Sequence, residues 1–134
     1  MSQKARYVIP TKIGDQYTQE RLTSTKKREY IKARVFKDFI TSNGYKDSII
    51  FDARLLKDVL FHLKNLDAAN TLSFKILACG EPDVWEVIKA ETDLAAATST
   101  YETSTEPWAF VKIQVKSKVA GTPAKITAYI GGQH

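Results

Sequence analysis

The residue types that most often carry catalysis are few in this sequence. Its two histidines are His62, inside an apolar run, and His134, and its single cysteine is Cys79. A catalytic or metal-ligating histidine needs a partner group held beside it, and a cysteine nucleophile needs a histidine neighbour. Nothing nearby in the sequence supplies such a partner. We therefore interpret His62 as an outward strand residue, Cys79 as a packing residue at a strand end, and His134 as a frayed terminus.

Patterns for phosphate or metal binding are also weak. No helix follows Gly131-Gly132, so this pair is not expected to form a phosphate nest. The carboxylates at positions 52, 58, 81 and 83 lack the dense spacing of a calcium loop and are interpreted as solvated turns. A single cysteine excludes an intramolecular disulfide and a zinc site of several thiolates. The sequence therefore predicts no cofactor, no metal and no enzymatic activity.

The charge of the chain is concentrated in its first third. The formal net charge of the 134 residues is +5. Residues 1–47 hold eleven Lys and Arg against five acids, which gives +6, whereas residues 48–134 hold nine against ten, which gives −1. A basic segment of this kind raises nucleic acid as a partner. Aromatic residues, which could stack on bases, are interleaved with the basic residues of this segment. The candidate nucleic-acid contacts are Lys26, Lys27, Arg28, Lys32, Arg34 and Lys37.

Two tryptophans stand at the entrances of predicted strands. Trp85 follows the turn at residues 80–83, and Trp108 precedes the strand that contains Phe110. Two such indoles could line a sugar-binding groove, but aromatic residues at strand ends more commonly close the ends of a sandwich core. A carbohydrate-binding module is therefore an alternative function, and core packing is the interpretation that we favour.

The second half of the chain shows the period of two that strands require. Leu72, Phe74, Ile76 and Ala78 share one face, and the same alternation recurs at 111–115 and 126–130. Further strands are predicted at 48–52, 59–65, 85–89 and 98–104, with a helix as the rival interpretation of 59–65. Short connections predict two hairpins, 59–65 with 72–78 and 109–116 with 124–130. The fold class is all-β, an antiparallel β-sandwich of jelly-roll or immunoglobulin-like type.

The first part of the chain differs from the rest. Residues 1–27 are predicted to form an extended basic arm, residues 28–134 form the β-sandwich domain, and residues 26–42 fit either a helix or a strand. An arm this polar buries little apolar surface, so it needs an extended contact surface to become ordered. That surface lies either on its own domain or on neighbouring subunits, and we favour neighbouring subunits. The arm residues expected to make these contacts are Arg6, Tyr7, Ile9, Ile13, Tyr17 and Leu22.

The strand pattern over residues 48–131 resembles the small β-sandwich modules of virion proteins in tailed, phage-like viruses. The resemblance lies in the runs at 59–65, 70–78, 85–88, 101–117 and 121–130. The turn before the tryptophan usually contains Asp-Gly in such modules, whereas this sequence has Pro82-Asp83-Val84.

The resemblance implies a structural protein present in many copies, either capsid-decorating or tail-associated. Its partners would be copies of itself and other virion proteins, and its location the virion, assembled in the host cytoplasm. The sequence contains neither an apolar run of membrane-spanning length nor an apolar stretch typical of a signal peptide, so we expect neither a membrane partner nor classical export.

Overall fold

The computed structural model of the chain describes residues 30–81 and 83–133. These residues form nine strands, and the described part of the chain contains no helix that could span a membrane. The predicted arm, residues 1–27, lies outside the described residues. The strands are β1 Tyr30–Ile40, β2 Lys46–Asp47, β3 Phe51–Asp52, β4 Asp58–Asn65, β5 Leu72–Glu81, β6 Val84–Leu94, β7 Ser99–Ser104, β8 Phe110–Ser117 and β9 Lys125–Gln133.

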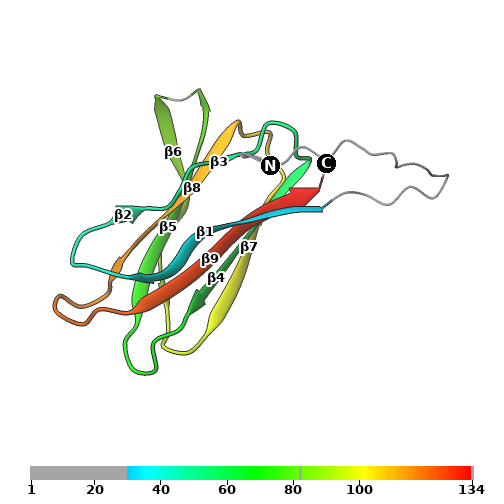
Figure 1. Cartoon of the computed structure of the whole chain (residues 1–134). Coiled ribbons are helices and arrows are strands. Elements are labelled where there is room, and N and C mark those ends of the chain that lie inside the picture. The colour runs from blue at the N-terminus through cyan, green and yellow to red at the C-terminus, as the bar shows by residue number, and fades with distance from the viewer. Residues whose placement is uncertain (1–29, 82, 134) are drawn as a thin grey trace.

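The strands form two antiparallel sheets that face each other (Figure 1). The first sheet has the order β1-β9-β4-β7, and the second has the order β2-β8-β5-β6. The short strand β3 also pairs with β8, nearer the start of β8 than β2 does. We therefore treat β2 and β3 as one interrupted strand. The predicted all-β sandwich is confirmed.

The order of the strands is that of a jelly roll. Counting β2 and β3 as one strand, the chain crosses to the opposite sheet at every connection except the β5–β6 hairpin. This alternation produces two four-stranded layers, the arrangement of two Greek keys. Of the two sandwich types predicted from the sequence, the structure therefore has the jelly-roll type.

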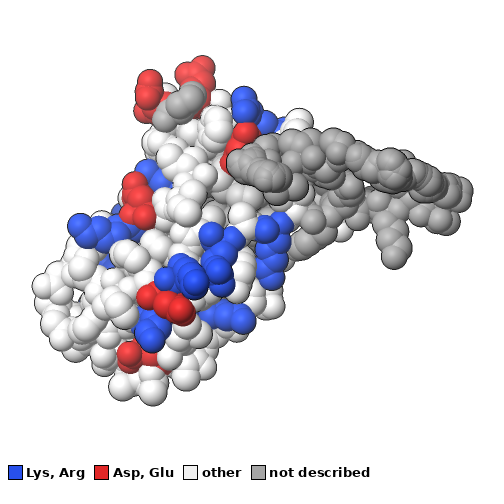
Figure 2. Space-filling model, viewed as in Figure 1, with Lys and Arg blue, Asp and Glu red and all other residues white. Residues whose placement is uncertain are grey.

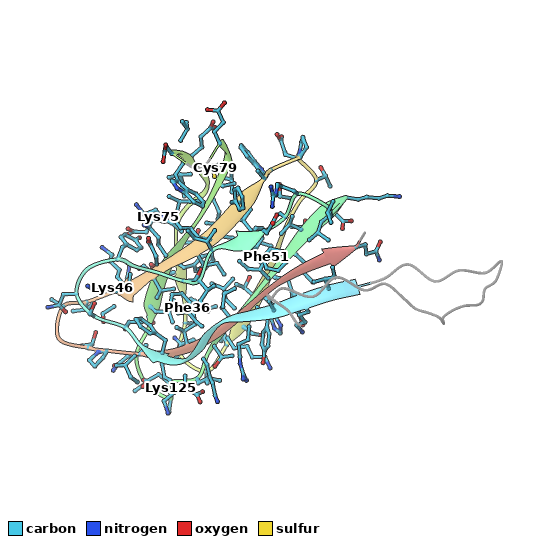
Figure 3. The ribbon with its side chains drawn as sticks, turned by 45° about the horizontal axis from the view of Figure 1, so that its top comes forward. Phe36, Lys46, Phe51, Lys75, Cys79 and Lys125 are labelled. Carbon is cyan, nitrogen blue, oxygen red and sulfur yellow. The ribbon has the colours of Figure 1, made fainter. Side chains whose placement is uncertain are left out.

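The core fills the space between the sheets. The predicted inward residues Phe74 of β5, Ile113 of β8 and Ile130 of β9 are fully buried. Phe36 and Phe51 also lie between the two sheets (Figure 3). The predicted facing of these strands is confirmed, because alternate residues of a strand point to opposite faces.

Both predicted hairpins are wrong. β4 and β5 belong to different sheets, and so do β8 and β9. Their short connections carry the chain across the core instead of turning it back beside itself. The buried side chain of Asn65 supports the first crossing by donating to the carbonyl oxygens of Asn70, at 2.9 Å, and Leu94, at 3.0 Å. At the second, Thr41 and Ser117 are hydrogen-bonded to each other at 2.8 Å, and Thr41 Oγ1 accepts from the backbone N–H of Ala124.

The structure decides three further predicted elements. The ambiguous segment 26–42 contains strand β1 from Tyr30, with an irregularity at Asp38, whose φ is 47°. The predicted strand 48–52 is shorter than expected, because only Phe51 and Asp52 pair with β8. Ser48 interrupts it: its side chain accepts from the backbone N–H of Ile113 at 2.9 Å. The predicted strand at 59–65 is confirmed over its helical rival.

The glycine pair of β9 has a packing role. Gly131 and Gly132 are buried between β1 and β4. A Cβ on Gly131 would clash with the backbone carbonyl oxygen of Ile31 in β1, and a Cβ on Gly132 with that of Asp58 in β4. Only glycine allows both neighbouring strands to approach β9 this closely.

We therefore expect Gly132→Ala to lower the free energy of unfolding by about 2–4 kcal/mol, because the clashing atom is backbone and cannot move alone. Gly44→Ala is the matched control, since no atom of the described residues lies within 4 Å of the added Cβ. It should change stability by no more than about 0.5 kcal/mol. Urea unfolding followed by tryptophan fluorescence measures both, and equal stabilities of the two variants would contradict the packing role.

Candidate interaction surfaces

The outer face of the β1-β9-β4-β7 sheet carries a row of four cross-strand neighbours. Arg34 of β1 is opposite Tyr129 of β9, Tyr129 is opposite His62 of β4, and His62 is opposite Tyr101 of β7. The His62 and Tyr101 rings stack with their centroids 4.0 Å apart, and the His62 and Tyr129 centroids are 6.0 Å apart. Tyr101 remains 61% exposed. The row is therefore an aromatic stack with one open end.

Cations surround this stack. Lys32 Nζ lies 4.5 Å from the centre of the Tyr129 ring, and Lys32, Arg34 and Lys37 are exposed on β1. Figure 2 shows Lys and Arg side chains gathered over β1 and β9. Among the residues that the structure describes, Lys32, Arg34, Lys37 and Lys64 form no ion pair. We call the outer face of this sheet, defined by Lys32, Arg34, Lys37, His62, Lys64, Tyr101 and Tyr129, the basic–aromatic face.

The pKa of His62 is affected by the positive charges of this face. The residue is 8% exposed, and Nδ1 has no hydrogen-bond partner among the residues that the structure describes. Burial lowers the pKa of His62, and the positive charges of Lys64 and Lys32 lower it further. The sequence correctly placed His62 on the outward side of its strand, but the two flanking tyrosines bury it. The described contacts of the ring are the stacked Tyr101 and Tyr129, an arrangement that suits packing.

The outer face of the opposite sheet is electrically balanced. Lys112 pairs with Asp47 at 3.0 Å, Lys116 with Glu91 at 3.7 Å, and Lys118 with Asp93 at 2.6 Å. Burial favours a raised pKa for Asp47, but hydrogen bonds from Gln114 and Lys112 outweigh it and lower that pKa. The Lys118 hydrogen bond likewise lowers the pKa of Asp93. The cations of this face are therefore largely neutralised within the chain.

The two tryptophans do not form a common groove. The Trp85 ring lies under Lys112 Nζ, at 4.4 Å, on the outer face of the second sheet. Trp108 packs against the core, and within the described part of the chain its buried Nε1 has no hydrogen-bond partner. The core-packing interpretation therefore holds for Trp108. A sugar site that needs both indoles side by side is not assembled.

The remaining candidate groups are structural. Cys79 is fully buried near the end of β5 (Figure 3), and burial raises the pKa of its thiol, which disfavours the reactive thiolate. Asp52 is paired with Arg54 at 2.7 Å. Within residues 30–81 and 83–133, no group of three or more His, Cys, Asp and Glu is placed to hold a metal ion. Lys26, Lys27 and Arg28 and all the named arm residues lie outside the described residues.

Comparisons with known proteins show similarity in fold. No protein-family model matches the sequence, and no curated protein matches it. Among solved structures, the chain is similar to one from the disulfide-linked pili of Bacillus endospore appendages, with 13% identity, a TM-score of 0.44, and coverage of 87% of this chain and 98% of that one.

The chain is also similar to chains of infectious bursal disease virus. For the Gx strain the identity is 11% and the TM-score 0.48, and the match covers 93% of this chain and 36% of that one. For the Gt strain the identity is 12% and the TM-score 0.42, with 94% and 37% covered. The present chain thus spans about a third of each virus chain. At these identities the likeness concerns the fold alone, and the resemblance to tailed-virus modules stays a prediction.

The buried His62 predicts a pH dependence of stability. The pKa of His62 is lower in the folded protein than its ordinary value of 6.5. As the pH falls through 6.5, the unfolded chain therefore binds a proton at this residue more readily than the folded protein does. The free energy of unfolding should therefore be constant above about pH 7 and fall towards pH 5. His62→Phe keeps a ring between the tyrosines and removes the titration and the unpaired Nδ1. It should abolish the change between pH 7 and 5 in urea unfolding curves, and an unchanged pH profile would contradict this assignment.

Proposed function

We propose that the chain is a non-enzymatic structural protein of a virus particle, assembled in many copies as a capsid-decorating or tail component. Its N-terminal arm makes contacts between subunits, and its location is the virion, assembled in the host cytoplasm. The observation that carries the proposal is the jelly-roll strand order around a filled interior. Jelly rolls serve as virus capsid domains, as lectins and as cupins.

The interior and the surface favour the first of these uses. Cupins work inside the barrel, where this chain has a packed core of large apolar residues such as Phe61, Phe74 and Leu63. A lectin role would use its tryptophans, but Trp85 and Trp108 contact different faces of a sheet. The outer surfaces remain, and the basic–aromatic face leaves its cations available to an acidic protein surface. Complementary charge at such contacts speeds association and selects partners.

The assembly role predicts that the arm and the fold are separable. Deletion of residues 1–27 should leave the melting temperature nearly unchanged, because the described sheets and core are built from Tyr30 onward. The same deletion should abolish the self-association that sedimentation velocity detects in the full chain at micromolar concentrations. A full chain that stays monomeric over that range, or a truncated chain that unfolds, would contradict the proposal.

A specific observation also favours nucleic acid as a second candidate partner. Lys32 and Arg34 flank the open aromatic stack, and stacking platforms with nearby cations are typical of single-strand binding. The exposed ring of Tyr101 offers the free face on which a base would stack. Nucleic acid would use the same surface as an acidic protein partner, so a binding experiment is needed to distinguish the two candidates.

Fluorescence anisotropy with a labelled single-stranded oligonucleotide tests the second candidate. Binding should weaken as salt rises, with log K falling by about 0.7 per phosphate contact for each tenfold rise in salt. Lys32→Gln/Arg34→Gln should reduce that slope, and Tyr101→Ala should weaken binding at every salt concentration. Lys46→Gln/Lys57→Gln is the matched control, because both lysines are exposed away from the basic–aromatic face. The absence of binding at low salt would eliminate nucleic acid as a partner.

A further inference from the structure

A groove runs along the side of the sandwich, where the two sheets end. It lies between β6, the last strand of one sheet, and β7, the last strand of the other. Its volume is about 510 Å³. Neither strand has a partner on its outer edge within the described part of the chain, so both edges offer free backbone groups. Such edges accept an additional strand from another chain.

The floor and the rim of this groove have different chemistry. Half-buried Ile88 and Trp108 give the floor its apolar surface, over the core residues Phe61 and Ile76, which are each 1% exposed. The rim carries Glu86, Glu102 and Glu106 against one cation, Lys89, which lies 3.4 Å from Glu102. The groove therefore fits an extended peptide that carries apolar side chains and positive charge.

The chain contains such a peptide ahead of its first described strand. Residues 4–13 include Lys4, Arg6 and Lys12, contain no acid, and also carry Tyr7, Val8, Ile9 and Ile13. In an extended conformation the period of two places Ala5, Tyr7 and Ile9 on one side and Lys4 and Arg6 on the other. Pro10 ends the stretch that can pair through every backbone N–H.

The length of this stretch also matches the edge strand. Lys4 to Ile9 is six residues, as is β7, Ser99–Ser104. At about 3.3 Å per residue, the two would span the same distance of roughly 20 Å. Tyr, Val and Ile are among the residues that fit a pleated, half-buried surface best.

We propose that the groove between β6 and β7 binds residues 4–9 of a second copy of this chain, as a strand added to the free edge of β7. This proposal rests on the proposed function, self-assembly in many copies, and names the surface that receives the arm. The side of the arm strand with Ala5, Tyr7 and Ile9 covers the floor. The long side chains of Lys4 and Arg6 start on the other side of the strand and reach the glutamates at the open rim of the groove. Each copy gives one arm and receives another, so the contact is heterologous and can extend from subunit to subunit.

Charge reversal at the rim tests the receiving surface. Glu86→Lys/Glu106→Lys in the full chain should weaken self-association by about tenfold or more in sedimentation velocity, because like charges now meet Lys4 and Arg6. Arg6→Glu on the same chain should restore part of the loss. Glu81→Lys/Asp83→Lys is the matched control: it makes the same change of charge at exposed positions near the β5–β6 turn, outside the groove. It should associate as the unaltered protein does, and equal behaviour of the two double variants would overturn the proposal.

Cross-linking identifies the occupant and its origin. Full chains carrying Ala5→Cys are mixed with differently tagged full chains carrying Thr105→Cys, and a short bismaleimide is added. The expected product is a mixed dimer, since Thr105 lines the groove and the native Cys79 is buried. Chains carrying Ala120→Cys, exposed on the loop before β9, replace the Thr105→Cys chains as the control and should give little product.

The outcomes separate this proposal from the one on which it rests. A full chain that never self-associates contradicts both. Self-association that persists without a mixed dimer and without sensitivity to the rim charges overturns the groove assignment alone. Cross-linking only within a single chain that carries both Ala5→Cys and Thr105→Cys also overturns it, because the arm then occupies the groove of its own domain.

Discussion

The structure depends on one apolar layer that two sheets bury together. Phe61 and Ile130 come from the first sheet, and Phe74 and Ile113 from the second, and each is at most 1% exposed. Neither sheet can bury its apolar face alone, so the chain must supply both sheets. The jelly roll does this by crossing the layer at nearly every connection. The close approach of β1 and β4 to Gly131 and Gly132 packs the three strands together near the end of β9, while Asn65, Thr41 and Ser117 satisfy polar groups at the crossings.

Period-two alternation allowed much of this fold to be predicted, because a residue's face depends only on its own strand. Leu72, Phe74 and Ile76 point inward as the pattern indicates. The partner of each strand was not predictable in the same way. Residues 66–71 are as suitable for a hairpin as for a crossing between sheets, and the difference lies in contacts such as Asn65 to Leu94, 29 positions apart in the sequence. Local pattern therefore predicted the strands and not their order.

The candidate surfaces show the same difference between what local pattern predicts and what strand pairing decides. Lys32, Arg34 and Lys37 stand close together in the sequence and were found as a basic segment. Tyr129, His62 and Tyr101 join them only because β9, β4 and β7 follow β1 across one sheet. Their outward positions in alternating strands were the available signal, but no pairing order linked them. The groove was beyond sequence reasoning for the same reason: β6 and β7 adjoin in the chain and yet end different sheets.

The distribution of charge differs between the outer faces of the two sheets. Carboxylates of β2 and β6 neutralise the lysines around β8, so the second sheet needs no partner to balance its outer face. The first sheet has the opposite character: Lys32, Arg34, Lys37 and Lys64 form no ion pair with the described residues, and the charges of Lys64 and Lys32 add to burial in lowering the pKa of His62. An acidic or phosphate-bearing partner would relieve that mutual repulsion. The side groove has the opposite sign, because its rim carries Glu86, Glu102 and Glu106. Under the proposed function, one cationic face and one anionic side give the molecule two different contacts, one for copies of itself and one for another surface.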